Sequence, residues 1–199
     1  MFGTYNSMGY DTIYVLGAGF SVPAGLPLSD RLLPLVFRKA YETRTPDCDS
    51  KWGHAQLLLD ALNFYCPGIR FSPKAILDGR VPKRFNFERF LTYVSAISAT
   101  QAGTTEFVDE HGNQQLSYFK AWSAQVIQEL EKESMIRGLP TMYSQFALNL
   151  KTSIVLTFNW DTILESILFA SGIEFQLDRK RLTLPPAVML HKLHGVGTL

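Results

Sequence analysis

The sequence has few cysteines, little net charge and no long apolar run. Its two cysteines, Cys48 and Cys66, cannot form a disulfide framework or a four-cysteine zinc site. A net charge of +1 gives no electrostatic reason to expect nucleic acid or an anionic membrane as the main partner. No apolar run approaches the roughly 18 residues of a membrane span, and residues 1–10 do not resemble a secretory signal. These absences predict a cytoplasmic protein.

The apolar residues that are present fall into patterns typical of an α/β protein. Hydrophobic residues make up 46% of the 199 residues, which is enough for one sizeable core. Short apolar runs at 12–16, 154–156 and 188–193 are typical of buried parallel strands, and 173–177 suggests a further strand. We expect one Rossmann-like domain over residues 1–199, with a parallel sheet and helices on both of its faces. A helical elaboration over about 30–150 would separate the first two core strands.

The helical elaboration is expected because apolar residues recur there at helical spacing. Ser29 can cap the first helix, in which Pro34 would cause a kink or a late start. Residues 70–84 are weakly patterned, and 104–115 has the composition of an exposed loop. The helices are expected at 30–43, 55–65, from 85–88 onward, 116–137 and 141–150.

Each of the three confident strands runs directly into a polar or glycine-rich cluster. The clusters are Gly17-Ala18-Gly19 with Ser21, Asn159 with Asp161, and His194 with Gly195. Because parallel strands place their carboxyl ends on one edge of a sheet, the clusters are expected to surround one cleft. Glycines directly after a strand let backbone N–H groups approach a ligand, usually a phosphate. The sequence therefore predicts a ligand site at this edge.

Each cluster also has an ordinary structural interpretation. The glycines can form a simple turn, and Val22 stands where a dinucleotide fingerprint has its third glycine. Asn159 or Asp161 can cap the helix that follows. A lone histidine in a strand is more often a core residue, and His191 fits that interpretation. The convergence of all three clusters on one edge is what favours a ligand site.

The clusters resemble three sirtuin motifs in the same order along the chain. Residues 17–21 and 25–27 look like the Gly-Ala-Gly-x-Ser and Gly-Ile-Pro of the sirtuin NAD loop. Residues 157–161, Thr-Phe-Asn-Trp-Asp, are similar to the sirtuin Thr-Gln-Asn-Ile-Asp. Residues 193–195 resemble the Leu-His-Gly that carries the sirtuin catalytic histidine. The resemblance spans nearly the whole chain.

The sequence also departs from the sirtuin deacylases. The interval from 161 to 194 contains no cysteine and is too short for their zinc module, so zinc is not expected. Residues 28–30 replace the deacylase Asp-Phe-Arg, and Phe158 replaces a glutamine. The long helical stretch, with Asn-Phe-Glu at 86–88, resembles instead the sirtuin-like domains of prokaryotic anti-phage systems, which cleave NAD.

The resemblance implies an NAD hydrolase that releases nicotinamide and ADP-ribose as the NAD-depleting effector of abortive infection. Asn159 would fix the attacking water or the ribose hydroxyls, and His194 would accept a proton. An NAD-dependent protein deacylase, an ADP-ribosyltransferase and a non-catalytic NAD or ADP-ribose sensor stay open as alternatives. The residues that would contact NAD are Gly17, Ala18, Gly19, Phe20, Ser21, Pro27, Thr157, Asp161 and Gly195.

Sirtuin-like domains continue beyond their Leu-His-Gly motif, whereas Leu199 follows His194 by only five residues. A sheet that ended here would leave the strand at 188–193 open on one edge, and an open edge invites pairing. We therefore expect a longer protein, a homo-oligomer, or a partner chain that completes the C-terminal edge. The 199 residues alone are expected to bind NAD weakly and to hydrolyse it slowly or not at all.

Overall fold

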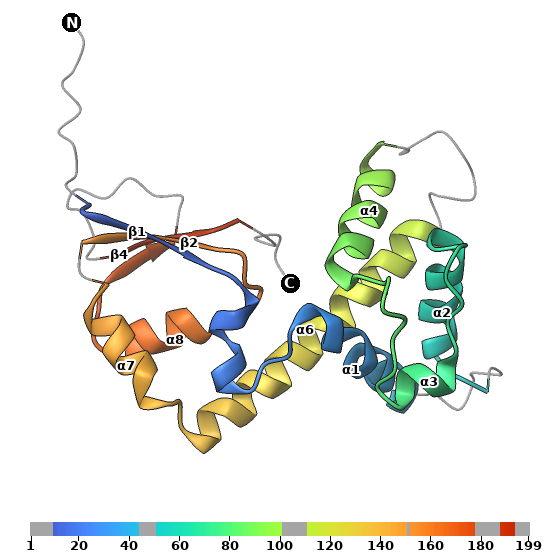
Figure 1. Cartoon of the computed structure of the whole chain (residues 1–199), viewed down its shortest axis with the longest axis horizontal. Helices are drawn as coiled ribbons and strands as arrows, with labels where there is room; N and C mark the ends of the chain where they lie inside the picture. The colour runs from blue at the N-terminus through green and yellow to red at the C-terminus, as the bar shows by residue number, and fades with distance from the viewer. Residues whose placement is uncertain (1–9, 44–50, 101–110, 151, 178–187, 194–199) are drawn as a thin grey trace, which may run out of the picture. The chain divides into compact units, whose positions relative to one another are not determined.

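The computed structural model describes residues 10–43, 51–100, 111–150, 152–177 and 188–193 (Figure 1). The chain divides into two compact units, which are described separately. The sheet unit comprises Met1–Leu26 with Leu130–Thr198, and the helical unit comprises Pro27–Glu129. Among the described helices, none is long and apolar enough to cross a membrane.

The sheet unit contains a four-stranded parallel sheet, which confirms the predicted α/β class and its Rossmann-like character. The strands are β1 (Thr12–Leu16), β2 (Ser153–Thr157), β3 (Phe175–Leu177) and β4 (Val188–Lys192), in the order β1-β2-β4-β3. In this order β1, β2 and β4, which match the three apolar runs at 12–16, 154–156 and 188–193, are neighbours. Leu16 pairs with Thr157, which in turn pairs with Lys192, so the three carboxyl ends share one edge.

Two helices, α7 (Thr141–Leu148) and α8 (Ile163–Ala170), lie on the same side of this sheet (Figure 1). The side chains of β2 and β4 that point toward them include the fully buried Val155 and Leu190. Helix α8 buries the apolar stripe that its sequence predicts, at Ile163, Leu164, Ile167 and Leu168. Burial of this stripe against the sheet supplies the main apolar core of the unit.

Strand β1 is more exposed than its apolar sequence predicts. The side chains of Ile13 and Val15 are 63% and 64% exposed, so the prediction of a buried strand is wrong for β1 in the described structure. Tyr14 contacts Phe146 of α7, so Ile13 and Val15 point to the opposite face of the sheet, which no described helix of this unit covers. Strand β1 also pairs only with β2, so no second strand shields it within the described sheet. Helices α7 and α8 lie on one face of the described sheet, whereas helices were expected on both (Figure 1).

The expectation that the last strand would lie open on one edge is also wrong. Strand β4 pairs with β2 on one side and with β3 on the other, so it lies inside the sheet. The short β3 falls within the strand expected at 173–177, but the sequence does not show that it crosses to the far side of β4. The edges of the described sheet are β1 and β3.

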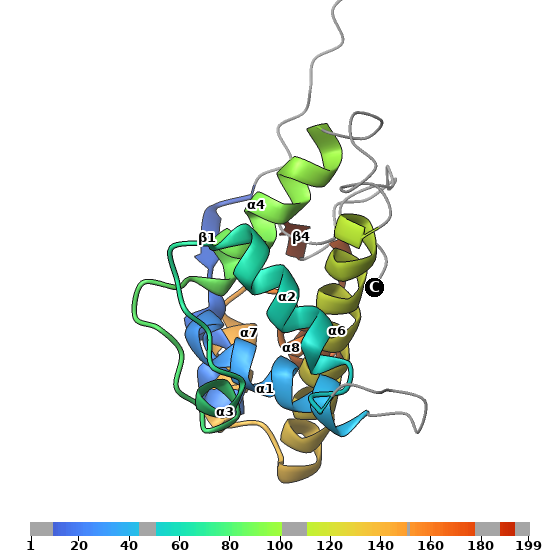
Figure 2. The ribbon, with the colours of Figure 1, turned by 90° about the vertical axis from the view of Figure 1, so that its right-hand side faces the viewer.

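The helical unit is built from α1 to α4 and the first part of α6. Their bounds are α1 (Ser29–Glu42), α2 (Ala55–Tyr65), α3 (Pro73–Leu77), α4 (Phe87–Thr100) and α6 (His111–Arg137). Figure 2 shows α1 to α4 beside α6. The core contains a cluster of buried phenylalanines, in which the ring of Phe90 lies 5.1 Å from that of Phe119 and 5.7 Å from that of Phe85. The aromatic residues at helical spacing therefore form a core, as the sequence predicts.

Helix boundaries differ from expectation at two places. Helix α1 begins at Ser29, and its N-cap is Leu28, so the predicted capping role of Ser29 is wrong. Pro34 lies inside α1 rather than at its start. Helix α6 begins at His111, so residues 111–115 are helical although a loop was expected over 104–115. Residues 111–115 have no apolar periodicity, so the sequence pattern does not detect this turn of helix.

Asn86 caps helix α4, because its Oδ1 accepts a hydrogen bond from the Arg89 backbone N–H at 2.8 Å. Removing this acceptor leaves one N–H of the first turn without a partner. We expect Asn86→Ala to lower the free energy of unfolding by about 1 kcal/mol in urea titrations followed by circular dichroism. Asn63→Ala, at an exposed site of α2, is the matched control, and equal effects of the two substitutions would contradict the capping role.

Candidate functional site

The segment after β1 folds into two short 3₁₀ turns, Ala18–Phe20 and Val22–Ala24. The N–H groups of Phe20 and Ser21 donate to the carbonyls of Gly17 and Ala18 at 2.9 and 3.1 Å. These two N–H groups are therefore used within the loop and do not supply the expected cradle for a phosphate. The loop closes on itself, since the Leu26 N–H donates to the Ser21 carbonyl at 3.2 Å.

Space lies open beside the first two glycines of this loop. A Cβ added to Gly17 or to Gly19 would meet no atom within 4 Å, and neither residue has a positive φ. Neither packing nor backbone strain therefore demands glycine at these two positions. The open space is compatible with close approach of a ligand, although Gly68 in the helical unit is open in the same way. Gly25 is different, because its φ is 92° and an added Cβ would lie 2.6 Å from the Arg137 guanidinium.

The loop after β1 meets the turn after β2 through a buried hydrogen bond. The Asn159 Nδ2 donates to the Ser21 Oγ at 3.0 Å, and the two residues are 6% and 1% exposed. Thr157 also orients the turn, because its Oγ1 accepts from the Asn159 N–H at 3.1 Å. The structure thus brings together Ser21, Thr157 and Asn159, which the sequence places in two separate clusters.

The other end of the Asn159 amide has no partner. Its Oδ1 is buried, and no hydrogen-bond donor among the described residues reaches it. A buried acceptor without a donor costs about 1–3 kcal/mol, so it favours a donor from beyond the described residues, such as a bound ligand. Asn159 is therefore held at one end by Ser21 and presents an unused acceptor at the other.

Asp161 takes part in the start of helix α8. Its Oδ1 accepts from the Ile163 N–H at 3.2 Å, and the residue is 8% exposed. Asp161 thus supplies a capping hydrogen bond to the start of α8 from the position before the N-cap residue, which is Thr162. Its Oδ2 has no hydrogen-bond partner among the described residues. Trp160, which lies between Asn159 and Asp161 in the chain, is half-buried.

Lys192, the last residue of β4, ties this strand to the start of α8. Its Nζ donates to the Asp161 carbonyl at 2.7 Å and pairs with the Glu165 carboxylate at 2.6 Å. In the following turn the Leu193 N–H donates to the Thr157 carbonyl at 2.8 Å. The end of β4 is therefore fixed beside the Asn159 turn. His194 and Gly195 follow directly but lie outside the described residues.

The remaining predicted contact residues have other surroundings. The Phe20 ring packs at 5.1 Å from Tyr143 and 5.2 Å from Phe146, both of α7. The Tyr143 hydroxyl donates to the Phe20 carbonyl at 2.6 Å, and burial, followed by the charge of Asp161, raises the pKa of Tyr143. Phe20 thus anchors the loop through packing. Pro27 is the first residue of the helical unit.

The sequence did not indicate Tyr143, Lys192 or Glu131 as parts of this site. Glu131, near the end of α6, accepts from the backbone N–H and the hydroxyl of Thr162, the second at 3.2 Å. No motif or spacing identifies these residues, because each acts through a partner far away in the chain. Among the residues that the structure describes, no three His, Cys, Asp or Glu side chains are grouped as a metal site would require.

Comparisons with known proteins add no family to this geometry. No family model matches the chain, and no curated protein matches it either.

Glu131 provides a test of the electrostatics around Thr162. Burial raises the pKa of its carboxyl, and the two hydrogen bonds from Thr162 only partly oppose that rise. A raised pKa means that the folded state favours the protonated form. This stabilisation is present below the ordinary carboxyl pKa and is lost as the pH rises through the raised one.

We therefore expect Glu131→Gln, which resembles the protonated acid, to become more stable relative to the parent as the pH rises. Thermal unfolding measured between about pH 4 and about pH 8 would show the difference in midpoint temperature moving in favour of the variant. Glu133→Gln removes an exposed carboxylate from the same helix and is the control. A difference for Glu131→Gln that stays constant or moves in the opposite direction would contradict the role of burial.

Proposed function

We propose that this chain hydrolyses NAD at the bond between nicotinamide and ribose. The observation that carries the proposal is the buried Asn159 amide, which is bound by Ser21 at one end and has an unused acceptor at the other. A water molecule or a ribose hydroxyl has the hydrogen-bond donor that this acceptor lacks. Together with the three sirtuin-like motifs, this arrangement supports NAD as the ligand.

The loop after β1 supports a dinucleotide rather than a smaller ligand. The open space beside Gly17 and Gly19 lies in the segment that leads to Ser21, whose hydroxyl binds Asn159. The edge formed by the carboxyl ends of parallel strands is where α/β sheets bind their ligands. An extended ligand could therefore run from the glycines to Asn159.

The reaction needs little acid catalysis from the protein. Water forms a bond to the anomeric carbon of the ribose, and the bond to the pyridinium nitrogen breaks with its electron pair passing to nicotinamide. Nicotinamide leaves as a neutral molecule, and the proton lost by water passes to a base. The products are nicotinamide, ADP-ribose and one proton. Asn159 would orient the water or the ribose, and His194 is the proposed base.

We further propose that the reaction serves anti-phage defence by depleting NAD, and that assembly controls it. An enzyme that destroys a central cofactor must be held inactive until it is needed. A homo-oligomer or a partner chain that completes the site would provide this control. No described feature favours transfer of ADP-ribose or deacylation, because these need a second acceptor site.

One observation favours a second candidate, a module that binds NAD or ADP-ribose without cleaving it. Asp161 already accepts from the Ile163 N–H, and a carboxylate that caps a helix contributes less to nicotinamide binding. Its Oδ2 would be the only oxygen available to the carboxamide. The two functions differ in whether nicotinamide is released.

We expect Asn159→Ala and His194→Ala each to lower nicotinamide release by about 10²–10⁴-fold, because each removes a group that acts on the water or its proton. Chromatography of nicotinamide and ADP-ribose in a timed reaction measures this loss, and circular dichroism checks the fold. Asn63→Ala is the matched amide control. Unchanged turnover in a folded Asn159→Ala variant would refute its role, and absence of nicotinamide release by the parent chain in its assembled form would refute hydrolysis.

Asp161→Asn separates ligand binding from helix capping. Asparagine caps a helix as well as aspartate does, so the fold should be retained while the negative charge is lost. We expect calorimetric titration to show a larger loss of affinity for NAD than for ADP-ribose, which has no nicotinamide. Equal losses for the two ligands would assign Asp161 to helix capping alone.

A further inference from the structure

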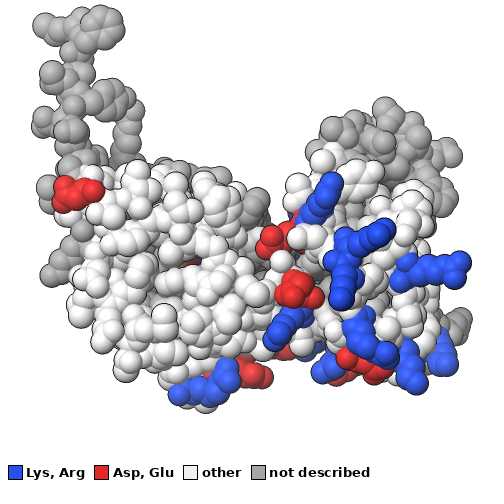
Figure 3. Space-filling view, in the orientation of Figure 1, with Lys and Arg blue, Asp and Glu red and all other residues white. Residues whose placement is uncertain are grey.

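The helical unit has a strongly uneven distribution of charge. Between Arg70 and Arg89 the chain holds six basic and two acidic residues, a net charge of +4, whereas the whole chain has a net charge of +1. On the face of this unit that is turned to the viewer in Figure 3, Lys and Arg outnumber Asp and Glu. The balanced composition of the chain therefore conceals a local excess of positive charge.

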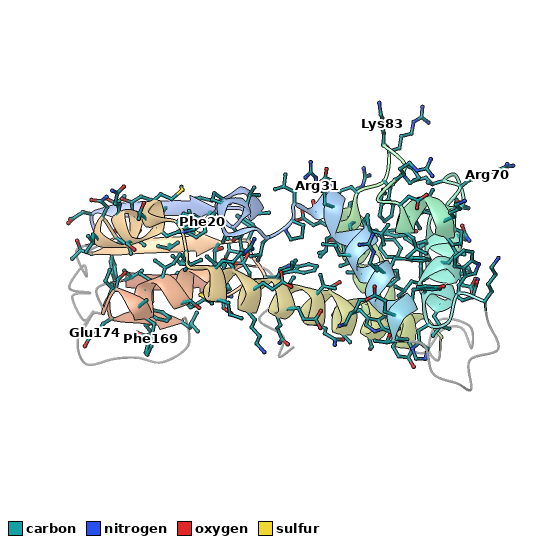
Figure 4. The ribbon with its side chains drawn as sticks, turned by 90° about the horizontal axis from the view of Figure 1, so that it is seen from below. Phe20, Arg31, Arg70, Lys83, Phe169 and Glu174 are labelled. Atoms are coloured by element: carbon teal, nitrogen blue, oxygen red, sulfur yellow. The ribbon has the colours of Figure 1, made fainter. Side chains whose placement is uncertain are left out.

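Most of these cations have no partner in the part of the chain that the structure describes. Arg80 pairs with Asp78 at 2.9 Å, which leaves Glu88 as the one acidic residue of the segment outside an ion pair. The other five cations are exposed, and none of their side chains has a hydrogen-bond or ion-pair partner among the described residues. These five residues, here called the basic surface, are Arg70, Lys74, Lys83, Arg84 and Arg89. Figure 4 shows Arg70 and Lys83 projecting away from the helices.

The fold of this segment fixes the basic surface in place. Phe71, Ile76 and Phe85 are buried, so the backbone between the cations is anchored in the core of the unit. The Arg38 guanidinium donates to the Leu77 carbonyl at 2.9 Å and ties α3 to α1. The charges are therefore displayed on an ordered surface, and an anion that contacts several of them would reduce their mutual repulsion.

The surroundings of the cations indicate which kind of anion fits. None of the exposed large apolar side chains of the described structure comes from the segment between Arg70 and Arg89. A protein interface usually has an apolar or aromatic centre, and an interfacial membrane anchor needs apolar side chains to insert. A phosphate backbone needs neither, because separate cations can neutralise successive phosphates. Three of the five cations are arginines, which also bind phosphate through two parallel hydrogen bonds.

We infer that the basic surface binds the phosphate backbone of nucleic acid without reading its sequence. This inference is independent of the proposed NAD chemistry, since it uses residues of the helical unit alone. Such binding would make the chain a nucleic-acid partner although its net charge gives no hint of one. It depends on the release of counterions and therefore weakens steeply as salt rises.

Fluorescence anisotropy with a labelled 20-base-pair DNA duplex and the matching single strand tests the inference on the full chain. Five phosphate contacts predict a slope of about −4 to −5 for log K against log salt on the duplex. We expect Lys83→Gln/Arg84→Gln to weaken binding and to make this slope shallower by about 2. Lys120→Gln/Lys132→Gln removes two exposed cations outside the basic surface and should leave the slope unchanged.

The result expected is saturable, salt-dependent binding that the first double variant weakens and the second does not. Absence of binding at low salt would overturn the inference, as would equal effects of the two double variants. Competition with poly-glutamate identifies the partner. If poly-glutamate displaces the duplex as effectively as unlabelled DNA does at equal charge, the surface recognises acidic polypeptide and the assignment to nucleic acid is wrong.

Discussion

The hydrogen bond between the Asn159 amide and the Ser21 hydroxyl connects two segments that lie 138 residues apart in the chain. It forms because β1 and β2 are parallel neighbours, so their carboxyl ends open onto the same edge. The bond fixes the orientation of the amide, and the orientation leaves one acceptor unused. Sheet order, the anchoring of the loop by Phe20 and Tyr143, and the hydrogen bond from Lys192 all help to hold the Asn159 amide in a buried position.

The sequence predicted those parts of the fold that depend on local pattern. The strand runs and the segment 55–65 appear where the periodicity places them, and the structure confirms the assumed adjacency of β1, β2 and β4. Burial of β1 and the placement of β4 at an edge were predicted wrongly. Both depend on which strand lies beside which, and apolar residues alone do not encode strand order.

The candidate site likewise contains residues that the sequence identifies and residues that it does not. Gly17, Ser21 and Asn159 were identified because they directly follow strands, whereas Tyr143, Glu131 and Lys192 contribute through single hydrogen bonds to distant partners. A contact of that kind leaves no periodic or spaced signal in the sequence. Asp161 had two interpretations, and its bond to the Ile163 N–H shows that capping is at least one of its roles. His194 lies outside the described residues, so its part in the site stays a prediction.

The position of Trp160 has a practical consequence. It is the only tryptophan that the sequence places in the sheet unit, and the other two, Trp52 and Trp122, belong to the helical unit. Trp160 lies between Asn159 and Asp161 in the chain and is half-buried, so its emission is expected to respond to the water content and polarity of that turn. A variant with phenylalanine in place of Trp52 and Trp122 would retain Trp160 as its only tryptophan, and the fluorescence of Trp160 would report on this turn. Occupancy of the strand edge could then be followed in real time without any label on the ligand.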